Sequence, residues 1–388
     1  MTTASSTPAA REQRNSSRIL AVGPAQGGVG DSFAMTIATA SAAPGLAVDS
    51  MRLAESSWAA VSALRLALQL RGRLAQADVV HVEFGSNDRT VFWLGLALML
   101  ARRDVTAVVH DFPKLMNRPA VGLLPVNHRW LEWLAHRMLS PLLDGLLERA
   151  LLRRAGAVCV FSEQAARGYD GRAYGAVRVI PHGDVQQSPR RVPPSESDYA
   201  LFAGYVGPSK GLDVLLAAWA GMPDHHGLRL VIAGDTSRVD EPRLQTLLAQ
   251  TSDWEHPPSL LGFIEDEESL QSVIANAAVV VLPYRKSSPA SGILVRAMAE
   301  GRPVVGTRVP AFAASVREGV DGLLVHPGDE DDLRAKLEVM ASDGGLRDRL
   351  GSEAQRRAGE LFSSKRQLLA LISAYAAARR PRTSEEPV

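Results

Sequence analysis

Two patterns of hydrophobic and polar positions alternate along the chain. Short apolar runs rich in β-branched residues, such as RILAVG and ADVVHVEF, predict buried strands. Longer segments with apolar residues three and four positions apart, such as AAVSALRLALQLRGRLAQ, predict helices. This βαβα order is typical of a parallel, doubly wound sheet that binds ligands at the carboxyl ends of its strands.

One polar, Pro- and Ser-rich stretch, DVQQSPRRVPPSESD, interrupts the alternation, and a second βαβα set follows it. The 388 residues suit two domains of about 150–200 residues each. We therefore expect two Rossmann-like domains. The predicted boundaries are a disordered tail at 1–17, a first domain at 18–184, a linker at 185–198, a second domain at 199–364, and at 365–388 a C-terminal helix and tail, the helix packing back toward the first domain.

Composition narrows the function classes. A net charge of +1 gives no overall attraction to nucleic acid, and one cysteine, Cys159, allows neither an internal disulfide nor a Cys-based zinc site. The N-terminal segment lacks the apolar core of a signal peptide. The longest apolar run, TVFWLGLALML, is shorter than the ~20 residues that a membrane span requires. We expect a cytoplasmic protein.

Three loops rich in small residues precede predicted helices, where backbone N–H groups can bind an anion. The first, GPAQGGVGDSF, contains Gly27, Gly28 and Gly30. Its spacing matches neither G-x-G-x-x-G nor a P-loop, which weakens the nicotinamide and P-loop interpretations. A tight strand-to-helix turn is the structural alternative for these glycines.

The other two loops both belong to the second domain. Lys210, in GYVGPSKGLDVLL, precedes a helix whose dipole it opposes, so a bound anion would explain its place; a solvated surface lysine is the alternative. Ser291 begins the helix of SSPASGILVRAMAE, as a ligand-binding turn or simply as an N-cap. Together these loops suggest a diphosphate site. The acidic runs EDEE and GDEDD suit helix starts better than a metal site.

Taken in order, the motifs GGVGDSF, VVHD, VIPHG, FAGYVGPSKGLDVLLAAW, LVIAGD, VVVLPY, SGILVRAMAEGRPVVGT and DGLLVHPGD resemble family 4 glycosyltransferases, retaining enzymes of the GT-B fold. The resemblance implies two Rossmann-like domains facing a central cleft. It implies transfer of a sugar, of the hexosyl type, from a nucleotide diphosphate sugar to an acceptor, with no metal and no cofactor besides this co-substrate.

The resemblance also assigns residues. Lys210 and His110 would be catalytic, the first on the donor diphosphate and the second beside the donor sugar with Ser287 and Ser288. The remaining diphosphate contacts would be Gly27, Gly28, Gly30, Arg285, Ser291, Gly292 and Ile293. The nucleotide would meet Gly204, Gly234, Gly262, Phe263 and Arg296.

Three positions depart from the family pattern. Ser288 and Arg296 stand where many relatives have two glutamates seven residues apart, and Tyr205 stands where many have an arginine. Because a guanidinium only donates hydrogen bonds, Arg296 cannot accept one from a ribose hydroxyl. It would instead meet a phosphate or pair with Glu300 one helical turn on, and Arg285 would supply the charge missing at Tyr205.

The acceptor is not readable from the residues. His81 and Glu83, which end a strand of the first domain, are candidate acceptor contacts, with a structural role as the alternative. A basic amphipathic segment, WLEWLAHRMLSPLLDGLLERALLRR, suggests peripheral contact with the cytoplasmic membrane face and a lipid-linked or polysaccharide acceptor; an ordinary core-facing helix is the alternative. Two other functions fit the same fold: a non-catalytic subunit that binds a partner enzyme, and a sugar-nucleotide epimerase.

Overall fold

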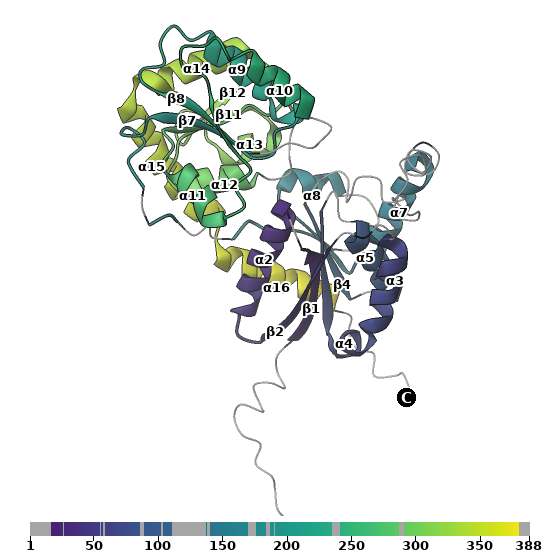
Figure 1. Ribbon diagram of the computed structural model, residues 1–388. Helices are drawn as coiled ribbons and strands as arrows, with labels where there is room; N and C mark the ends of the chain where they lie inside the picture. Colours follow the sequence, from purple (N-terminus) through teal and green to yellow (C-terminus); the bar gives the residue numbers. More distant parts are fainter. Residues whose placement is uncertain are drawn as a thin grey trace, which may run out of the picture. The chain divides into compact units, whose positions relative to one another are not determined.

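The computed structural model describes residues 17–25, 27–54, 56, 59–85, 89–101, 104–110, 137, 140–169, 176–183, 187–189, 191–234, 241–286 and 291–379. Two units make up the chain, one of residues 1–183 with 364–388 and one of residues 184–363. Each unit contains a six-stranded parallel sheet with helices on both faces (Figure 1). The predicted pair of Rossmann-like, parallel-sheet domains is therefore confirmed, while a cleft between them stays a prediction.

In the first unit the strands are ordered β2-β1-β3-β4-β5-β6. The order reverses between β1 and β3, and this reversal is where open α/β sheets bind ligands. The strands are β1 (Ser17–Pro24), β2 (Leu46–Leu53), β3 (Val79–Phe84), β4 (Val105–Val109), β5 (Ala157–Val160) and β6 (Ala176–Val179). The helices are α2 (Gly27–Ser41), α3 (Ala59–Gln69), α4 (Arg71–Gln76), α5 (Arg89–Ala101), α7 (Ser140–Arg154), α8 (Glu163–Tyr169) and α16 (Ser364–Ala378).

The two faces of this sheet differ in chemistry. Val80, Val82 and Phe84 of β3 point into an apolar core that includes α3, α5 and α7. Because side chains alternate along a strand, His81 and Glu83 point to the other face. There α2 and α16 cover the sheet, and α16 contacts α2, β4, β5 and β6. The C-terminal helix thus completes the first unit.

In the second unit the order is β12-β11-β10-β7-β8-β9, with the reversal between β7 and β10. The strands are β7 (Tyr199–Ala203), β8 (Arg229–Ala233), β9 (Ser259–Gly262), β10 (Val279–Leu282), β11 (Val304–Thr307) and β12 (Leu323–Val325). The helices are η3 (Pro208–Lys210), α9 (Leu212–Ala220), α10 (Glu241–Ala249), α11 (Glu267–Ala275), α12 (Gly292–Ala299), α13 (Pro310–Ser315), α14 (Glu330–Ser342) and α15 (Gly344–Leu361).

The strands of the second unit other than the exposed edge strand β9 are buried on both faces by apolar side chains. Phe202, Ile232 and Val281 face one core with α9 and α14, and Leu201, Val231 and Val280 face another with α12 and α13. Strands buried on both faces read as continuous apolar runs, which is why this half of the sequence is the easier to interpret.

The segment predicted as a linker is bound to the second unit over its described part. The Ser188 N–H donates to Glu300 Oε1 at 2.6 Å, and the Arg347 guanidinium donates to the carbonyls of Pro194 and Ser195. Buried Arg302 donates to the Val192 carbonyl at 2.8 Å. These charge-assisted bonds fix Ser188, Val192, Pro194 and Ser195 as part of the second unit.

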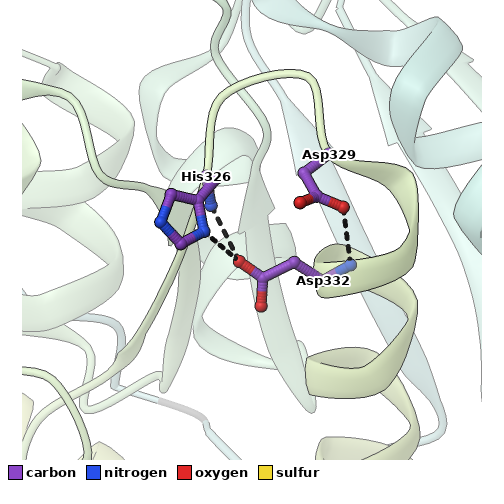
Figure 2. Close-up of side chains that lie close together, drawn as sticks. All are labelled: His326, Asp329 and Asp332. Carbon is purple, nitrogen blue, oxygen red and sulfur yellow. Dashed lines mark hydrogen bonds and ion pairs between the residues drawn. The ribbon is translucent and has the colours of Figure 1, made fainter.

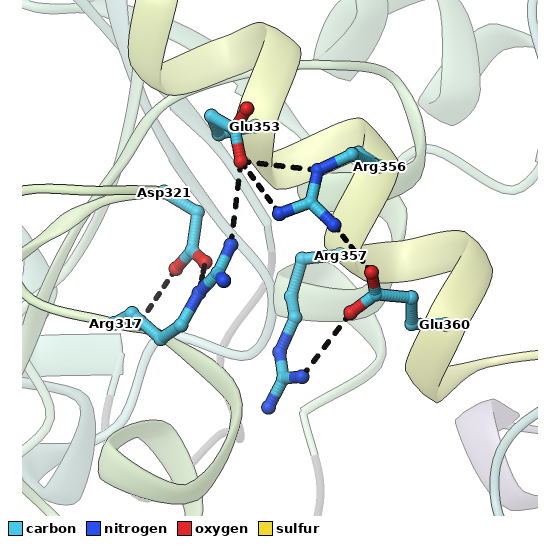
Figure 3. A network of polar contacts seen from close by, with 6 residues as sticks. All are labelled: Arg317, Asp321, Glu353, Arg356, Arg357 and Glu360. Carbon is cyan, nitrogen blue, oxygen red and sulfur yellow. Dashed lines mark hydrogen bonds and ion pairs between the residues drawn. The ribbon is translucent and has the colours of Figure 1, made fainter.

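A network of arginines and carboxylates holds α15 against the turn that precedes β12 (Figure 3). Arg317 donates to buried Asp321 and also to Glu353 of α15. Arg356 bridges Glu353 and Glu360, and Arg357 joins the same Glu360. Most of these side chains are partly exposed, so the network orders the turn more than it adds stability.

Two of the elements that were not predicted from the sequence are β2 and α15. Strand β2 lies at a sheet edge with exposed Asp49 and Ser50, and its mixed sequence lacks the signature of a buried strand. Helix α15 contains four glycines, a composition that disfavours helix. It packs through small residues instead: a Cβ at Gly351 would lie 2.2 Å from the Gly301 carbonyl oxygen. None of the described helices is long and apolar enough to cross a membrane.

Candidate active site

Three glycines form one backbone ledge at the carboxyl ends of β7, β8 and β9. The Gly204 N–H donates to the Ala233 carbonyl at 2.9 Å, and the Gly234 N–H donates to the Gly262 carbonyl at 2.8 Å. A Cβ at Gly234 would lie 1.9 Å from the Gly204 carbonyl oxygen. The backbone therefore needs glycine at Gly234, and the ledge presents backbone without side chains to anything bound above it.

Lys210 lies in the loop after β7, at the reversal of strand order. The next residue, Gly211, has φ of +71°, and a Cβ there would lie 2.0 Å from the Pro283 carbonyl oxygen. This close approach joins the loop after β7 to the loop after β10. The Arg285 N–H strengthens the junction by donating to the Ser209 carbonyl at 2.8 Å.

The start of α12 provides hydrogen-bond donors beside this loop. Ser291 caps the helix: its Oγ accepts from the Leu294 N–H at 3.3 Å, and its carbonyl accepts from the Val295 N–H at 3.1 Å. The Gly292 and Ile293 N–H groups come earlier in the first turn, where helix geometry supplies no acceptor. Ile293 also reaches the glycine ledge, since its Cγ1 would lie 3.6 Å from a Cβ at Gly204.

Tyr284, for which the sequence predicted no role, connects Lys210 to α12. The Lys210 ammonium nitrogen lies 3.8 Å from the centroid of the Tyr284 ring, and the Tyr284 hydroxyl lies 3.4 Å from Ser291 Oγ. The ring is almost fully buried against Phe312. A tyrosine directly after an apolar strand and a proline, in VVVLPY, is the signal that could have revealed it.

Arg285 is not a free cation. Its guanidinium donates to Asp213 Oδ2 at 2.7 Å, and Arg243 donates to the same oxygen at 3.0 Å. Asp213 lies in the first turn of α9. The charge that the sequence analysis assigned to an anion is therefore shared with a carboxylate, and Arg285 is 42% exposed.

The predicted pair between Arg296 and Glu300 is wrong. Arg296 donates instead to Glu267 of α11, with an Nε-to-Oε1 distance of 3.0 Å. Glu300 is fully buried and accepts from the Ser188 N–H and from Gln271 Nε2. Sequence spacing could not reveal this, because the partner of Arg296 lies on a neighbouring helix.

The remaining candidates of the second unit fall around the same edge. Phe263 follows Gly262 at the end of β9 and is 65% exposed, so its ring is available for stacking. Tyr205 is also exposed, and its ring lies over Gly207. Ser287 and Ser288 lie outside the described residues.

In the first unit, the glycine-rich segment begins a helix. Gly27, Gly28 and Gly30 occupy the first turn of α2, which therefore starts within the segment predicted as a loop. The segment follows β1, so it too lies at a reversal of strand order. His110 directly follows β4, and its ring lies against Phe161 with 4.5 Å between centroids.

His81 and Glu83 do not face an acceptor in this structure. Both side chains are fully buried in β3. Glu83 Oε1 lies 2.8 Å from His110 Nε2, and His81 Nδ1 lies 3.1 Å from the Tyr375 hydroxyl. The geometry supports the structural alternative, because a side chain enclosed by β3, α2 and α16 cannot touch a surface-bound acceptor.

A cluster of His326, Asp329 and Asp332 marks the start of α14 (Figure 2). Asp329 Oδ1 accepts from the Asp332 N–H, and Asp332 Oδ2 accepts from the His326 N–H and faces its Nδ1, each at 2.9 Å. Burial alone would raise the pKa of Asp332, but the hydrogen bonds from His326 hold it below its ordinary value. These contacts explain the acidic run as a helix cap.

Residues 197–343 match the family model of glycosyl transferases group 1. Most of the second unit is thus similar to group 1 glycosyltransferases. The chain is 32% identical over 203 residues to a phosphatidyl-myo-inositol mannosyltransferase of Mycobacterium leprae. The matched segment covers 50% of this chain and 52% of that protein. The chain's matches to two other curated glycosyltransferases span 40% and 38% of their lengths.

The fold resemblance extends over both units. Sucrose-phosphate synthase from Thermosynechococcus elongatus superposes with a TM-score of 0.70 at 19% identity, covering 93% of this chain and 98% of that one. HepE from Anabaena, solved in complex with UDP-glucose, superposes with a TM-score of 0.69 at 18% identity, covering 93% and 99%. The two units thus have the GT-B fold, and the segment similar to group 1 glycosyltransferases lies in its second half.

Proposed function

We propose that the protein is a retaining, family 4 glycosyltransferase that transfers a hexosyl group from a nucleotide diphosphate sugar. The observation that carries this proposal is that Tyr284 joins Lys210 to Ser291, the N-cap of α12, at the reversal between β7 and β10. The N–H groups of Gly292 and Ile293 follow that cap and have no acceptor within the helix. A cation beside a helix N-terminus suits a diphosphate. The glycine ledge beside them can approach a nucleotide closely.

In the proposed reaction, the protein groups stabilise the negative charge that develops on the leaving diphosphate. As the bond between the anomeric carbon and the diphosphate breaks, negative charge grows on the leaving oxygen. Lys210 and the α12 N–H groups are held in place before the reaction, so they stabilise that charge without reorganising. A diphosphate oxygen then accepts the proton of the attacking acceptor hydroxyl on the same face of the sugar, and the configuration is retained.

Residues of the first unit complete the proposal. His110 would bind a hydroxyl of the donor sugar, and Gly27, Gly28 and Gly30 would close over the phosphates. HepE was solved with UDP-glucose, and the Mycobacterium leprae relative is named a phosphatidyl-myo-inositol mannosyltransferase. These names support a sugar nucleotide as donor and a polar lipid or saccharide as acceptor.

Contact with the cytoplasmic face of a membrane is part of the proposal. Helix α7 packs inward through Leu147, Leu151 and Leu152, and outward it presents Leu146 and a row of arginines. The exposed arginines are Arg149, Arg153 and Arg154. Arginines around an exposed leucine suit an anionic lipid surface. Trp130 and Trp133 of the same predicted segment lie outside the described residues.

The experiment is a thermal-shift panel of UDP, GDP and ADP and their glucose or mannose conjugates, on wild type and on Lys210→Met. One nucleotide should stabilise wild type and lose most of that effect in Lys210→Met. Lys336→Met is the matched control, since it removes a lysine of the same unit that is paired with Glu318. Equal stabilisation of all three proteins would contradict the proposed site.

Turnover separates the enzyme from its alternatives. Wild type should slowly hydrolyse the preferred sugar nucleotide, with chelator present, because the proposed charge stabilisation uses protein groups. Binding without any hydrolysis would favour a non-catalytic subunit. Conversion of the donor to its epimer in the absence of acceptor would favour an epimerase.

A further inference from the structure

A buried carboxylate at the centre of the first unit has no part in the function proposed above. Glu83 is fully buried on the face of β3 that α2 and α16 cover. An ionised carboxylate removed from water is costly unless charged or hydrogen-bonding partners compensate it. The partners of Glu83 therefore indicate what the residue is for.

Those partners form a line of polar groups that ends at His110. The Tyr375 hydroxyl of α16 lies 3.1 Å from His81 Nδ1, and His81 Nε2 lies 3.8 Å from Glu83 Oε2. Glu83 Oε1 then lies 2.8 Å from His110 Nε2. The hydrogen bond of Glu83 is thus made to the histidine that follows β4, whereas its contact to His81 is beyond hydrogen-bond length.

The ionisation state of Glu83 decides which nitrogen of His110 carries the proton. Burial by itself raises the pKa of Glu83, but the hydrogen bond from His110 and the nearby His81 ring bring it below its ordinary value. Glu83 is then ionised at neutral pH, and an ionised carboxylate only accepts hydrogen bonds. His110 Nε2 must therefore donate, and a neutral ring is left with an unprotonated Nδ1.

We propose that Glu83 is the positioning residue of His110: it holds the Nε2–H tautomer, so that Nδ1 accepts a hydrogen bond from a hydroxyl group of the donor sugar. The ring plane is fixed from a second side by Phe161. This inference rests on the proposed function for the role of His110, and it assigns Glu83 an indirect part in the reaction in place of acceptor binding.

The consequence is a requirement on the substrate. A bare Nδ1 binds a hydroxyl, which can donate, and does not bind a fluorine or methoxy group at the same position of the sugar. Donor sugars that retain this hydroxyl are accepted, and analogues that lack it bind more weakly. The reason is that the Glu83–His110 pair cannot move its proton to Nδ1 without protonating Glu83.

The tautomer can be measured without any ligand. Histidine labelled with ¹⁵N gives two-bond ¹H–¹⁵N correlations whose pattern distinguishes the two tautomers, and His110→Gln identifies the His110 signals among the nine histidines. Wild type should show the Nε2–H pattern at neutral pH. An Nδ1–H pattern would overturn the inference, and this result does not depend on whether the protein transfers sugars.

Variants test the role of the carboxylate. Glu83→Gln should mix the His110 tautomers, because an amide can either donate or accept. Tyr375→Phe, the matched control, removes a hydroxyl two partners away from His110 and should leave the tautomer unchanged. An unchanged tautomer in Glu83→Gln would overturn the inference.

Kinetics distinguish positioning from simple support of the fold. Glu83→Gln should lower kcat of donor hydrolysis about 10- to 100-fold, by analogy with the loss when the outer hydrogen-bond partners of metal-binding histidines are removed. The double variant Glu83→Gln/His110→Gln should lose no more activity than His110→Gln alone, since both act through one group. The inference would be overturned if the activity losses of the two single variants added up in the double variant. It would also be overturned if the kcat loss of Glu83→Gln matched its loss of folded protein. If no variant or wild type binds a nucleotide, the proposed function fails while the tautomer result stands.

Discussion

Gly211 has a backbone conformation that requires glycine, and it directly follows Lys210 of the proposed diphosphate site. Its φ of +71° belongs to the left-handed region, and a Cβ there would lie 2.0 Å from the Pro283 carbonyl oxygen. We therefore predict that Gly211→Ala destabilises the second unit and displaces Lys210, which precedes it.

The magnitude has two parts. An L-residue in the left-handed region costs roughly 1–2 kcal/mol. Relieving the contact with Pro283 adds local backbone strain on the order of 1–3 kcal/mol, because the colliding atom is backbone and cannot rotate away. At roughly 2–4 °C per kcal/mol for a unit of this size, the first part alone lowers the melting temperature by about 2–8 °C.

Gly227→Ala isolates the first part. Gly227 has φ of +78°, and a Cβ there would meet nothing within 4 Å. It lies in the turn before β8, away from the carboxyl edge of the sheet. We expect Gly211→Ala to lower the melting temperature about twice as much as Gly227→Ala and to weaken nucleotide binding, which Gly227→Ala should leave intact.

Differential scanning calorimetry gives the melting temperatures, and hydrogen exchange of peptides from β7 to β9 assigns the transition to the second unit. Titration calorimetry with the nucleotide that stabilises wild type gives the affinities. Equal melting temperatures and equal affinities in the two alanine variants would refute the reasoning, because they would show that the close approach to Pro283 holds nothing in place.

Three further predictions follow from particular contacts. Lys210→Met should weaken nucleotide diphosphate binding about 10- to 100-fold in titration calorimetry, the value of one lost hydrogen bond from a charged group; an affinity equal to that of Lys336→Met would contradict it. The folded-state pKa of Glu83 lies below its unfolded value, so its contribution to stability is present above about pH 4.3 and is lost as pH falls through the folded value; urea unfolding of wild type should show a pH slope that Glu83→Gln lacks. Arg296 and Glu267 form a partly exposed pair, so a double-mutant cycle of their glutamine variants should give a coupling below about 1 kcal/mol.

The sequence predicted the sheets well because their strands are short, apolar and bounded by glycine or proline. VVVL and LVIA can be buried on both faces, and both became central strands, β10 and part of β8. The edge strand β2 was missed because three of its eight residues, Asp49, Ser50 and Arg52, are polar or charged and exposed. Helix α15 was missed because its stability comes from close packing of Gly351 and Ala354, which intrinsic propensity does not register.

The sequence predicted the site residues that lie within short local motifs, but not the contacts between residues far apart in the chain. Lys210 and Ser291 stand beside glycines in motifs that are readable one at a time, and the structure brings both to Tyr284. The partners of Arg296 and Arg285 could not be predicted, because Glu267 and Asp213 lie on other helices. The line from Tyr375 to His110 joins residues more than 260 positions apart, a separation that no local pattern reveals.

The central claim is that a nucleotide diphosphate binds at the reversal between β7 and β10. Hydrogen exchange with and without the stabilising nucleotide tests it most directly, since it locates the bound ligand on the chain. We predict that protection concentrates in peptides covering residues 204–211 and 291–295. Protection confined to other segments, with these two unchanged, would contradict the account.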